Sequence, residues 1–408
     1  MRVRPFQAWR PLPELAGSVA SPPYDVVSRA EAAALANGNP LNFFHVVRSE
    51  IDLPEDTDPH DPRVYAKARE NLDRLVRQKA LLRELRPTLY LYRMVMEGRA
   101  QVGVVGCVDV DEYERGVIKK HETTRPDKED DRTRHMLALD AHPEPVLLAH
   151  RGSPTLSRLV TEATERPPLY DFTGVGGVRH TVWAPADPAP YVQAFDEVAS
   201  AYVADGHHRS ASAWRAAHKS AVQGVDHSAG GGRWSFPAVL FPAAELRILP
   251  YNRVVVDLGG QTPVEVLRKL ETIGRLSATA MRTPARPGSF CIYLAHRWYL
   301  LELAESSIDR TDIRRSLDVT LVHERVLGPI LGIGDPRTDA RIDFVGGLRG
   351  PAELEARVDS GQAALAVSLY PTSIEELMSI SDAGHVMPPK STWFEPKLAS
   401  GLFVHPFD

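Results

Sequence analysis

Two adjacent histidines and an arginine stand between a strand-like run and a small-residue helix in YVADGHHRSASAWRAAH, residues 202–218. A strand followed by Asp-Gly and a helix is typical of an anion site, because the first N–H groups and the positive end of the helix point toward the ligand. Glycine permits close approach to the backbone, and arginine offers a planar bidentate donor for phosphate or carboxylate. We therefore expect a phosphate site made by Gly206, His207, His208 and Arg209, with Asp205 beside it.

A second polar segment, KKHETTRPDKEDDR at residues 119–132, leads into a helix that we expect to extend to about His142. Its later acidic residues suit the first turn of a helix. The earlier HETTR combines titratable side chains with hydroxyls ahead of a proline, and such a segment can hold a general base beside cations that orient an anion. Glu122 is the candidate base. The expected substrate contacts are His121, Thr123, Thr124 and Arg125, with Lys120 as a further cation.

Two proline-containing segments add candidate binding residues. SPPYDVVS at 21–28 presents Tyr24 and Asp25 on a stiff turn, either as a pocket wall or as a rigid entry to a helix that Ser28 and Glu31 cap. MPPKSTWFEPKLASGL at 387–402 carries Lys390, which is expected over a phosphate unless this loop only packs its aromatics into the core. The segment lacks the glycine-rich start of a P-loop, which excludes a Walker A motif.

The segment LDVTLVHERVLGPILGI at 317–333 is apolar at helical spacing and predicts a core helix, from which His323 and Glu324 are placed to line a pocket. The chain contains no G-x-S-x-G, H-E-x-x-H or G-x-G-x-x-G. The common hydrolase, zinc-protease and dinucleotide-binding classes therefore lack their signatures here.

Helix-like and strand-like segments alternate around these motifs, which predicts a mixed α/β fold. An amphipathic helix is expected over 61–84, and a hairpin over 88–110. A glycine-rich loop at 228–234 suggests a boundary between an N-terminal α/β domain, residues 1–227, and a C-terminal α/β domain, residues 235–408.

The composition of the 408 residues favours a soluble globular protein, with 25% charged residues and a formal net charge of −5. This charge disfavours a dedicated nucleic-acid-binding protein. Cys107 and Cys291 lie in apolar runs and are expected to be buried core residues. With no signal-peptide pattern and no apolar run long enough to span a membrane, a cytoplasmic location is expected.

Six motifs in order resemble the bacterial and archaeal family named domain of unknown function 1015, over essentially the whole chain. They are SPPYDVVS, HETTRPDKEDDR, ADGHHRSASA, LRILPYNRVV, LDVTLVHERVLGPILG and PPKSTWFEPKLASGL. The strand–G-x-[HR]-R–helix turn also resembles the phosphate-binding turn of the ParB and sulfiredoxin superfamily, which includes free-serine kinases. This resemblance implies a ParB/sulfiredoxin-like core in which residues 206–209 hold nucleotide phosphates. The sulfiredoxin cysteine is missing, so sulfinic-acid reduction is not expected.

Three functions remain open at this stage. The first is a phosphotransferase that uses ATP or ADP, or else CTP, together with Mg²⁺, on a small hydroxyl metabolite such as free L-serine. Glu122 or Asp205 would then orient or deprotonate the hydroxyl. The second is a ParB-like protein that binds a nucleotide without phosphotransfer. The third is a metal-dependent hydrolase whose ligands are drawn from His121, Glu122, Asp205, His207 and His208.

Overall fold

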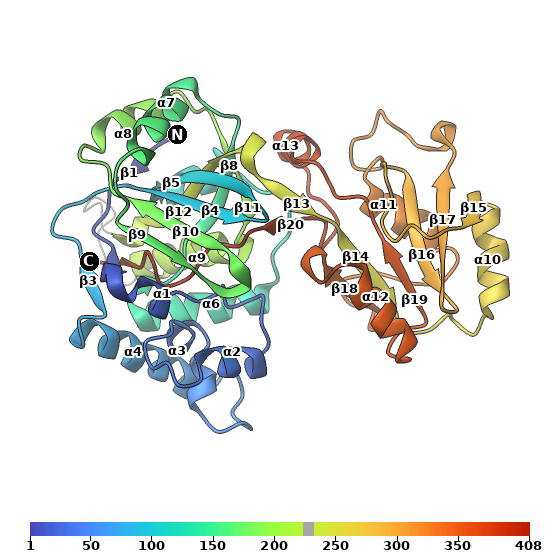
Figure 1. Ribbon diagram of the computed structural model, residues 1–408, viewed down its shortest axis with the longest axis horizontal. Coiled ribbons are helices and arrows are strands. Elements are labelled where there is room, and N and C mark those ends of the chain that lie inside the picture. The colour runs from blue at the N-terminus through green and yellow to red at the C-terminus, as the bar shows by residue number, and fades with distance from the viewer. Residues whose placement is uncertain (223–231) are drawn as a thin grey trace. The chain divides into compact units, whose positions relative to one another are not determined.

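The chain forms two compact units in the computed structural model, which describes residues 1–222 and 232–408 (Figure 1). Unit 1 comprises Met1–Leu246 and Pro396–Asp408, and unit 2 comprises Arg247–Glu395. The sequence boundary at 227–235 differs from this division, because strand β12 (Ser235–Pro242) pairs with strands of unit 1 and the C-terminal segment also belongs to unit 1. Most of the glycine-rich loop predicted at 228–234 lies outside the described residues.

Within the described residues, unit 1 is built on a nine-stranded mixed sheet with the order β6-β11-β8-β12-β5-β4-β10-β9, in which β1 also pairs with β5. The bounds of the other strands in this sheet are β1 (Val3–Arg4), β4 (Tyr90–Met96), β5 (Arg99–Asp109), β6 (Ile118–Lys119), β8 (Val146–His150), β9 (Tyr170–Thr173), β10 (Arg179–Trp183) and β11 (Ala201–Asp205). Two small pairs accompany it, β2 (Trp9–Pro11) with β3 (Leu81–Arg83) and β7 (Ala141–His142) with β21 (His405–Pro406).

The described helices of unit 1 are α1 (Ala16–Val19), α2 (Arg29–Ala36), α3 (Phe44–Val47), α4 (Pro62–Arg77), α5 (Val110–Glu114), α6 (Pro126–Leu139), α7 (Pro154–Thr164), α8 (Ala189–Phe195) and α9 (His207–Val222). The small residues Ala213 and Ala217 of α9 join the buried cluster of the large sheet. The short side chains of these alanines allow α9 to pack closely on the strands. The N-terminus of α9 is held at the end of β11, since only Gly206 separates the two elements.

Local sequence signals explain several element boundaries. The predicted hairpin is formed by β4 and β5, joined by Glu97 and Gly98, which both have positive φ as a type I′ turn requires. The predicted capping box of Ser28 and Glu31 is present at the start of α2.

Helix α4 is shorter than predicted. The expectation of a single helix over 61–84 is wrong beyond Arg77, because Lys79 adopts a left-handed φ of 57°. The N–H of Ala80 then donates to the carbonyl of Leu75 at 2.9 Å, which is the closing bond of a Schellman motif. Leu82 consequently lies in strand β3 rather than on the helix.

Unit 2 is built on a six-stranded sheet with the order β15-β17-β16-β19-β14-β18. Its strands are β14 (Tyr251–Val255), β15 (Gly274–Ala278), β16 (Ser289–Leu294), β17 (Arg297–Leu303), β18 (Ile342–Gly346) and β19 (Leu365–Ser368), and β13 (Arg247–Leu249) pairs separately with β20 (Trp393–Glu395). The helices are α10 (Pro263–Glu271), α11 (Asp318–Val322), α12 (Gly350–Asp359) and α13 (Ile374–Asp382). A π-helical turn, His323–Leu327, continues α11.

The mixed α/β class predicted from the sequence is confirmed in both units. Cys107 on β5 and Cys291 on β16 are buried free thiols, as expected. Across the residues that the structure describes, none of the helices has the length and apolar character needed to cross a bilayer.

Candidate functional site

The two central polar motifs meet at one edge of the unit 1 sheet. Strands β6 and β11 are parallel neighbours, with Ala201 opposite Ile118 and Tyr202 opposite Lys119. Parallel strands end at the same edge of a sheet, so the segment that follows β6 lies beside the turn that follows β11. Glu122 and its neighbours therefore adjoin the turn at Gly206, although the two segments are more than 80 residues apart in the sequence.

A cluster of two imidazoles and one carboxylate marks this junction. The rings of His121 and His207 meet edge to face, with centroids 4.4 Å apart and an interplanar angle of 88°. The Nδ1 atom of His207 lies 4.0 Å from Oε2 of Glu122. One possible ligand atom from each of these three side chains lies within 4.8 Å of the others. The arrangement can therefore accept a proton, bind an anion or hold a metal ion.

Both imidazoles of the cluster are neutral at physiological pH. Burial lowers the pKa of His121 to about 4. Burial, assisted by the nearby His121 ring, also brings the pKa of His207 well below its ordinary value. His207 is only 6% exposed, and its Nε2 is a buried atom without a hydrogen-bond partner. Because unpaired buried polar atoms are costly, this nitrogen is suited to contact a ligand.

The turn between β11 and α9 has the backbone geometry expected of an anion site. Gly206 adopts a φ of 97°, a conformation that favours glycine. The first helical hydrogen bond runs from the N–H of Ser210 to the carbonyl of Gly206 at 3.0 Å. The N–H groups of His207, His208 and Arg209 precede that bond, and such groups have no partner within a helix. The site therefore presents donors at the positive end of α9.

Arg209 takes part in a buried ion-pair network that the sequence did not predict. Its Nη2 lies 2.8 Å from Oδ2 of Asp205, and its Nη1 donates to the carbonyl oxygen of Pro145. Lys397 contacts the second oxygen of Asp205 at 3.2 Å. Burial opposes ionisation of Asp205, but these two cations outweigh it and lower the pKa of the carboxyl. Two of the guanidinium nitrogens are thus engaged within the protein, so the predicted bidentate contact to phosphate would require this network to rearrange.

Gly206 and Arg209 are also coupled through their packing. A Cβ atom at position 206 would lie 2.9 Å from Nε of Arg209. The guanidinium therefore covers the glycine, and any larger side chain at that position would displace it.

The SPPYD turn belongs to the same edge of unit 1. The N–H of Tyr24 donates to Oε1 of buried Glu144 at 3.3 Å, and the Ser400 hydroxyl donates to the same oxygen at 2.5 Å. Burial raises the pKa of Glu144. The Arg132 guanidinium lies 4.3 Å from the centroid of the Tyr24 ring. Asp25 is exposed, and its charge helps to raise the pKa of Arg209.

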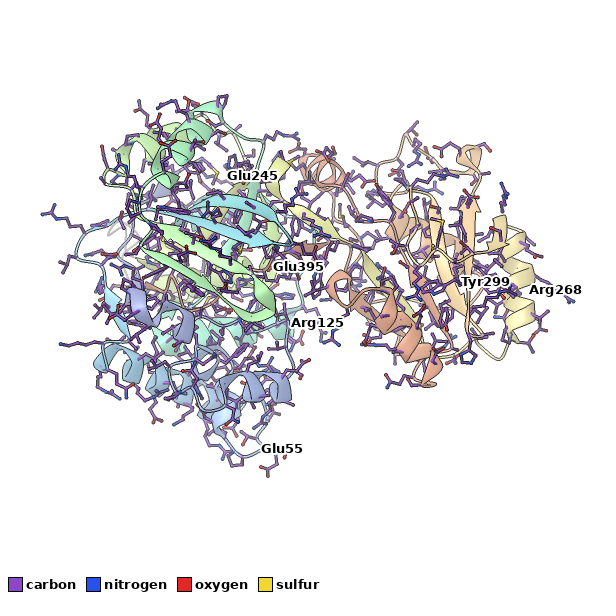
Figure 2. All side chains as sticks on the ribbon, viewed as in Figure 1. Glu55, Arg125, Glu245, Arg268, Tyr299 and Glu395 are labelled. Carbon is purple, nitrogen blue, oxygen red and sulfur yellow. The ribbon has the colours of Figure 1, made fainter. Side chains whose placement is uncertain are left out.

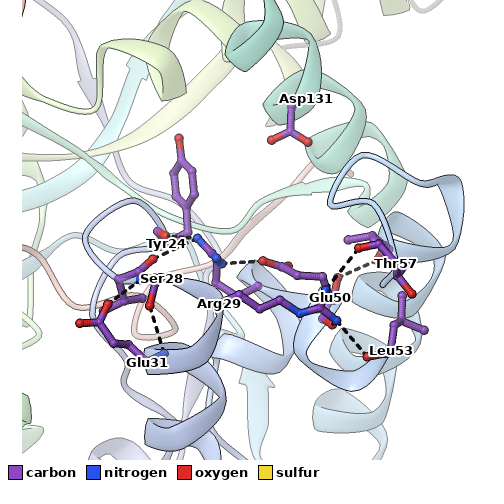
Figure 3. A network of polar contacts seen from close by, with 12 residues as sticks. Tyr24, Ser28, Arg29, Glu31, Glu50, Leu53, Thr57 and Asp131 are labelled. Carbon is purple, nitrogen blue, oxygen red and sulfur yellow. Dashed lines mark hydrogen bonds and ion pairs between the residues drawn. The ribbon is translucent and has the colours of Figure 1, made fainter. Parts of the chain in front are cut away.

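Neighbouring loops hold this turn in place, as Figure 3 shows for Tyr24, Arg29 and the segment from Glu50 to Thr57. Arg48 donates to the carbonyl of Tyr24 at 2.9 Å and pairs with Glu50. Arg29 donates to the carbonyls of Glu50, Leu53 and Thr57. The stiffness expected from the two prolines is thus reinforced by two arginines.

The remaining residues of HETTR have different surroundings. Thr123 is exposed, whereas the Thr124 hydroxyl donates to Oε1 of Glu129 at the start of α6. Arg125 projects from the surface of unit 1, where its side chain pairs with Asp127 at 2.8 Å (Figure 2). Its backbone N–H donates to Nε2 of His208 at 3.1 Å, a second link between the two motifs.

The C-terminal motif is divided between the units. Lys390 belongs to unit 2, where its Nζ lies 5.5 Å from the centroid of the Tyr251 ring, and its contact with a phosphate stays a prediction. Lys397 and Ser400 of the same motif belong to unit 1 and reach Asp205 and Glu144. Glu144 and Lys397 were missed as site residues, because no spacing pattern links them to residues 205–209.

Comparison with known proteins identifies the family. A family model described as "Protein of unknown function (DUF1015)" matches residues 3–320. The chain belongs to this family. The DUF1015 match contains both central motifs, and Lys397 lies beyond its end. No curated protein matches the chain.

Several solved structures share low similarity with this DUF1015 protein. A free serine kinase in complex with AMP is 13% identical, with 71% of this chain and 86% of that chain covered and a TM-score of 0.34. SbnI with a C-terminal truncation, from Staphylococcus aureus, is 14% identical, with 74% and 87% covered and a TM-score of 0.39. A conserved hypothetical protein from Pyrococcus furiosus is 14% identical, with 73% and 95% covered and a TM-score of 0.33. Similarity at this level assigns no residue roles.

Proposed function

We propose that this protein is a nucleotide-dependent phosphotransferase that acts on a small metabolite bearing a hydroxyl group, with free L-serine as the first candidate. The observation that carries the proposal is the position of Glu122 beside the N-terminal turn of α9, where the Oε2 atom lies 4.0 Å from Nδ1 of His207. A possible general base thereby adjoins a possible phosphate site, as phosphoryl transfer requires.

The terminal phosphate of ATP or ADP would bind at the turn formed by residues 206–209. The N–H groups at the start of α9 favour negative charge, and the unpartnered Nε2 of His207 supplies one more polar contact. Neutral His207 and His121 add no charge of their own, so the positive end of the helix and Lys120 would provide most of the attraction. CTP carries the same phosphates and is the alternative donor.

Glu122 would act on the acceptor. Its side chain is 27% exposed, so a small alcohol can reach the carboxylate from solvent. As the hydroxyl oxygen bonds to the terminal phosphorus, its proton passes to Glu122, and the bond between that phosphorus and the bridging oxygen breaks to release the shorter nucleotide. Asp205 is a weaker candidate for the base, because its two oxygens already accept from Arg209 and Lys397.

The cluster of His121, Glu122 and His207 fits Mg²⁺ only when the nucleotide supplies further oxygen ligands. Mg²⁺ prefers oxygen ligands, and Glu122 is the only oxygen donor in the three-residue cluster. The ion would therefore enter with the phosphates of the nucleotide, whose charge it neutralises, rather than on the two imidazoles.

The test is a transfer assay on the full chain with Mg²⁺, ATP or ADP, and free L-serine or other small alcohols, with phosphorylated product detected by ³¹P NMR. Glu122→Gln should lower the transfer rate by about 100-fold or more, the usual range for loss of a general base, while nucleotide binding is retained. Glu162→Gln on α7, which removes an exposed glutamate paired with Arg158, is the matched control and should leave the rate unchanged. Nucleotide binding without any product would instead support a nucleotide-binding regulatory protein.

A metal-dependent hydrolase is the second candidate, because one specific observation favours it. Two imidazoles and one carboxylate, as in His121, His207 and Glu122, suit Zn²⁺, Mn²⁺ or Fe²⁺ better than Mg²⁺. Elemental analysis of protein purified without chelator distinguishes the candidates. A stoichiometric transition metal that is lost in His207→Gln, together with phosphate release to water rather than to an alcohol, would favour the hydrolase.

A further inference from the structure

Unit 2 contains a pocket of about 250 Å³ that lies outside the site described above. Its polar lining comes from Arg253, Thr320, His323 and Glu324, and its apolar lining includes Leu327, Ile342 and three prolines. The volume is slightly below the range of about 300–1,000 Å³ that is common for small-molecule sites. The pocket therefore suits a small ligand with an apolar part and a few polar groups.

Arg253 is the most unusual residue of this pocket. It lies on β14 between β18 and β19, is only 3% exposed, and donates a hydrogen bond through Nη1 to the carbonyl oxygen of Tyr251. Its guanidinium also lies 5.2 Å from the centroid of the Phe344 ring. Among the described residues it forms no ion pair, and burial lowers its pKa to about 10.

Two buried arginines of unit 1 differ from Arg253, because each of them pairs with a carboxylate. Arg209 pairs with Asp205, and Arg132 pairs with Asp131 at 2.7 Å. A buried cation without a counter-charge is unfavourable, and such groups are normally paired or in contact with a ligand. The carboxylate that Arg253 lacks within unit 2 is thus expected from a molecule bound in the pocket.

Two further polar atoms of the pocket residues are unsatisfied. Oγ1 of Thr320 and Nδ1 of His323 are buried without hydrogen-bond partners. The two residues are three apart, so they share one face where α11 continues into the π-helical turn. π-Helical turns occur frequently at functional sites. A hydroxyl and an imidazole are therefore available beside the guanidinium to complete the binding of an oxygen-bearing group.

We propose that this pocket binds a small free amino acid with an apolar side chain. The ligand carboxylate pairs with Arg253 and accepts from Thr320, the apolar side chain packs on Leu327, Ile342 and the prolines, and the ammonium group faces Glu324. Glu324 is an exposed residue of the pocket lining, and its negative charge disfavours a doubly charged phosphate. The pocket residues all belong to unit 2 and include none of the proposed phosphotransfer site, so the proposal does not depend on that site.

The experiment is isothermal titration of the full chain with alanine, valine and leucine, with butyrate as a carboxylate that lacks the amine, and with inorganic phosphate. We expect binding of at least one amino acid and weaker binding of butyrate, and any phosphate binding, which would occur at residues 206–209, should be unchanged in Arg253→Met. Arg253→Met should weaken amino-acid binding roughly 10- to 100-fold, as for loss of a charge-assisted pair. Arg268→Met removes an exposed arginine of the same unit, labelled in Figure 2, and should leave binding unchanged.

Thr320→Val keeps the shape of the side chain, so it serves if Arg253→Met fails to fold, and it should also weaken binding. Phosphate binding that Arg253→Met weakens would overturn the proposal, as would equal binding of butyrate and valine. Equal amino-acid affinity of the original protein and the Arg253 or Thr320 variant, or no binding of any of the amino acids, would also overturn it.

Discussion

Asp205→Asn provides the sharpest test of the ion-pair network at the end of β11. The carboxylate lies 2.8 Å from Nη2 of Arg209 and 3.2 Å from Nζ of Lys397, and these cations are only 3% and 14% exposed. The substitution leaves two largely buried positive charges without their counter-charge. Breaking a buried ion pair costs about 3–5 kcal/mol, and because asparagine retains one acceptor oxygen we expect about 3 kcal/mol.

Native-state hydrogen exchange measures this loss within unit 1 directly. Amides of β11 and α9 should lose protection in Asp205→Asn, whereas amides of β16 and β19 in unit 2 provide an internal reference. Asp171→Asn, which breaks the surface pair with Arg179, is the matched control and should cost less than about 1 kcal/mol. Unchanged protection of β11 and α9 at pH 7 would refute the role of Asp205.

The pH dependence gives a second check on the same residue. Because the pKa of Asp205 is lowered in the folded state, its stabilisation is present above the unfolded value of about 3.9 and is lost as the pH falls further toward the folded value. The difference in protection between the original protein and Asp205→Asn should therefore be constant near neutrality and shrink below about pH 4.

Three further outcomes are expected. Gly206→Ala should lower the free energy of unfolding, measured by urea denaturation, by about 1–3 kcal/mol. The reason is that φ is 97° at this position and the new Cβ would lie 2.9 Å from Nε of Arg209, so an unchanged free energy would contradict this packing. Acidification from pH 7 to pH 5 should lower the free energy of unfolding of unit 1, because burial lowers the pKa of His121, His150 and His180 to about 4 in the folded state. The unfolded chain therefore binds protons at a higher pH than the folded chain, and each histidine contributes up to about 2 kcal/mol to the loss. A free energy of unfolding that stays constant between pH 7 and pH 5 would refute this expectation. Lys397→Met should lower the free energy of unfolding by about 1–3 kcal/mol, because it removes one of the two cations that pair with Asp205. In a double-mutant cycle, the combined loss in Lys397→Met and Asp205→Asn should be smaller than the sum of the two single losses, and a simple sum would show that the two side chains are not coupled.

Local features of the fold were predictable because their causes are local. The capping box of Ser28 and Glu31 depends on residues three apart, and the hairpin turn at Glu97 and Gly98 depends on two adjacent backbone conformations. The end of α4 was predicted too late, because the apolar spacing continues into β3 while Lys79 alone turns the backbone. Periodicity reports which side is buried, but it does not report where a lysine takes a positive φ.

The candidate site was predictable only in its parts. Residues 121–125 and 205–209 were each chosen for their chemistry, but their contact depends on the pairing of β6 with β11, which no local pattern encodes. The partners of Arg209 were missed for the same reason, since Lys397 is 192 residues from Asp205. Arg253 drew no attention because an arginine inside a strand is ordinary until its burial and missing counter-charge are known.

The most direct measurement for the proposed phosphotransferase is a crystal structure of the full chain soaked with ADP and Mg²⁺. Phosphate oxygens should lie about 2.7–3.2 Å from the backbone nitrogens of residues 206–209, with the Glu122 carboxylate facing the terminal phosphate. A nucleotide bound elsewhere in the chain, with this turn empty of phosphate, would contradict the central claim.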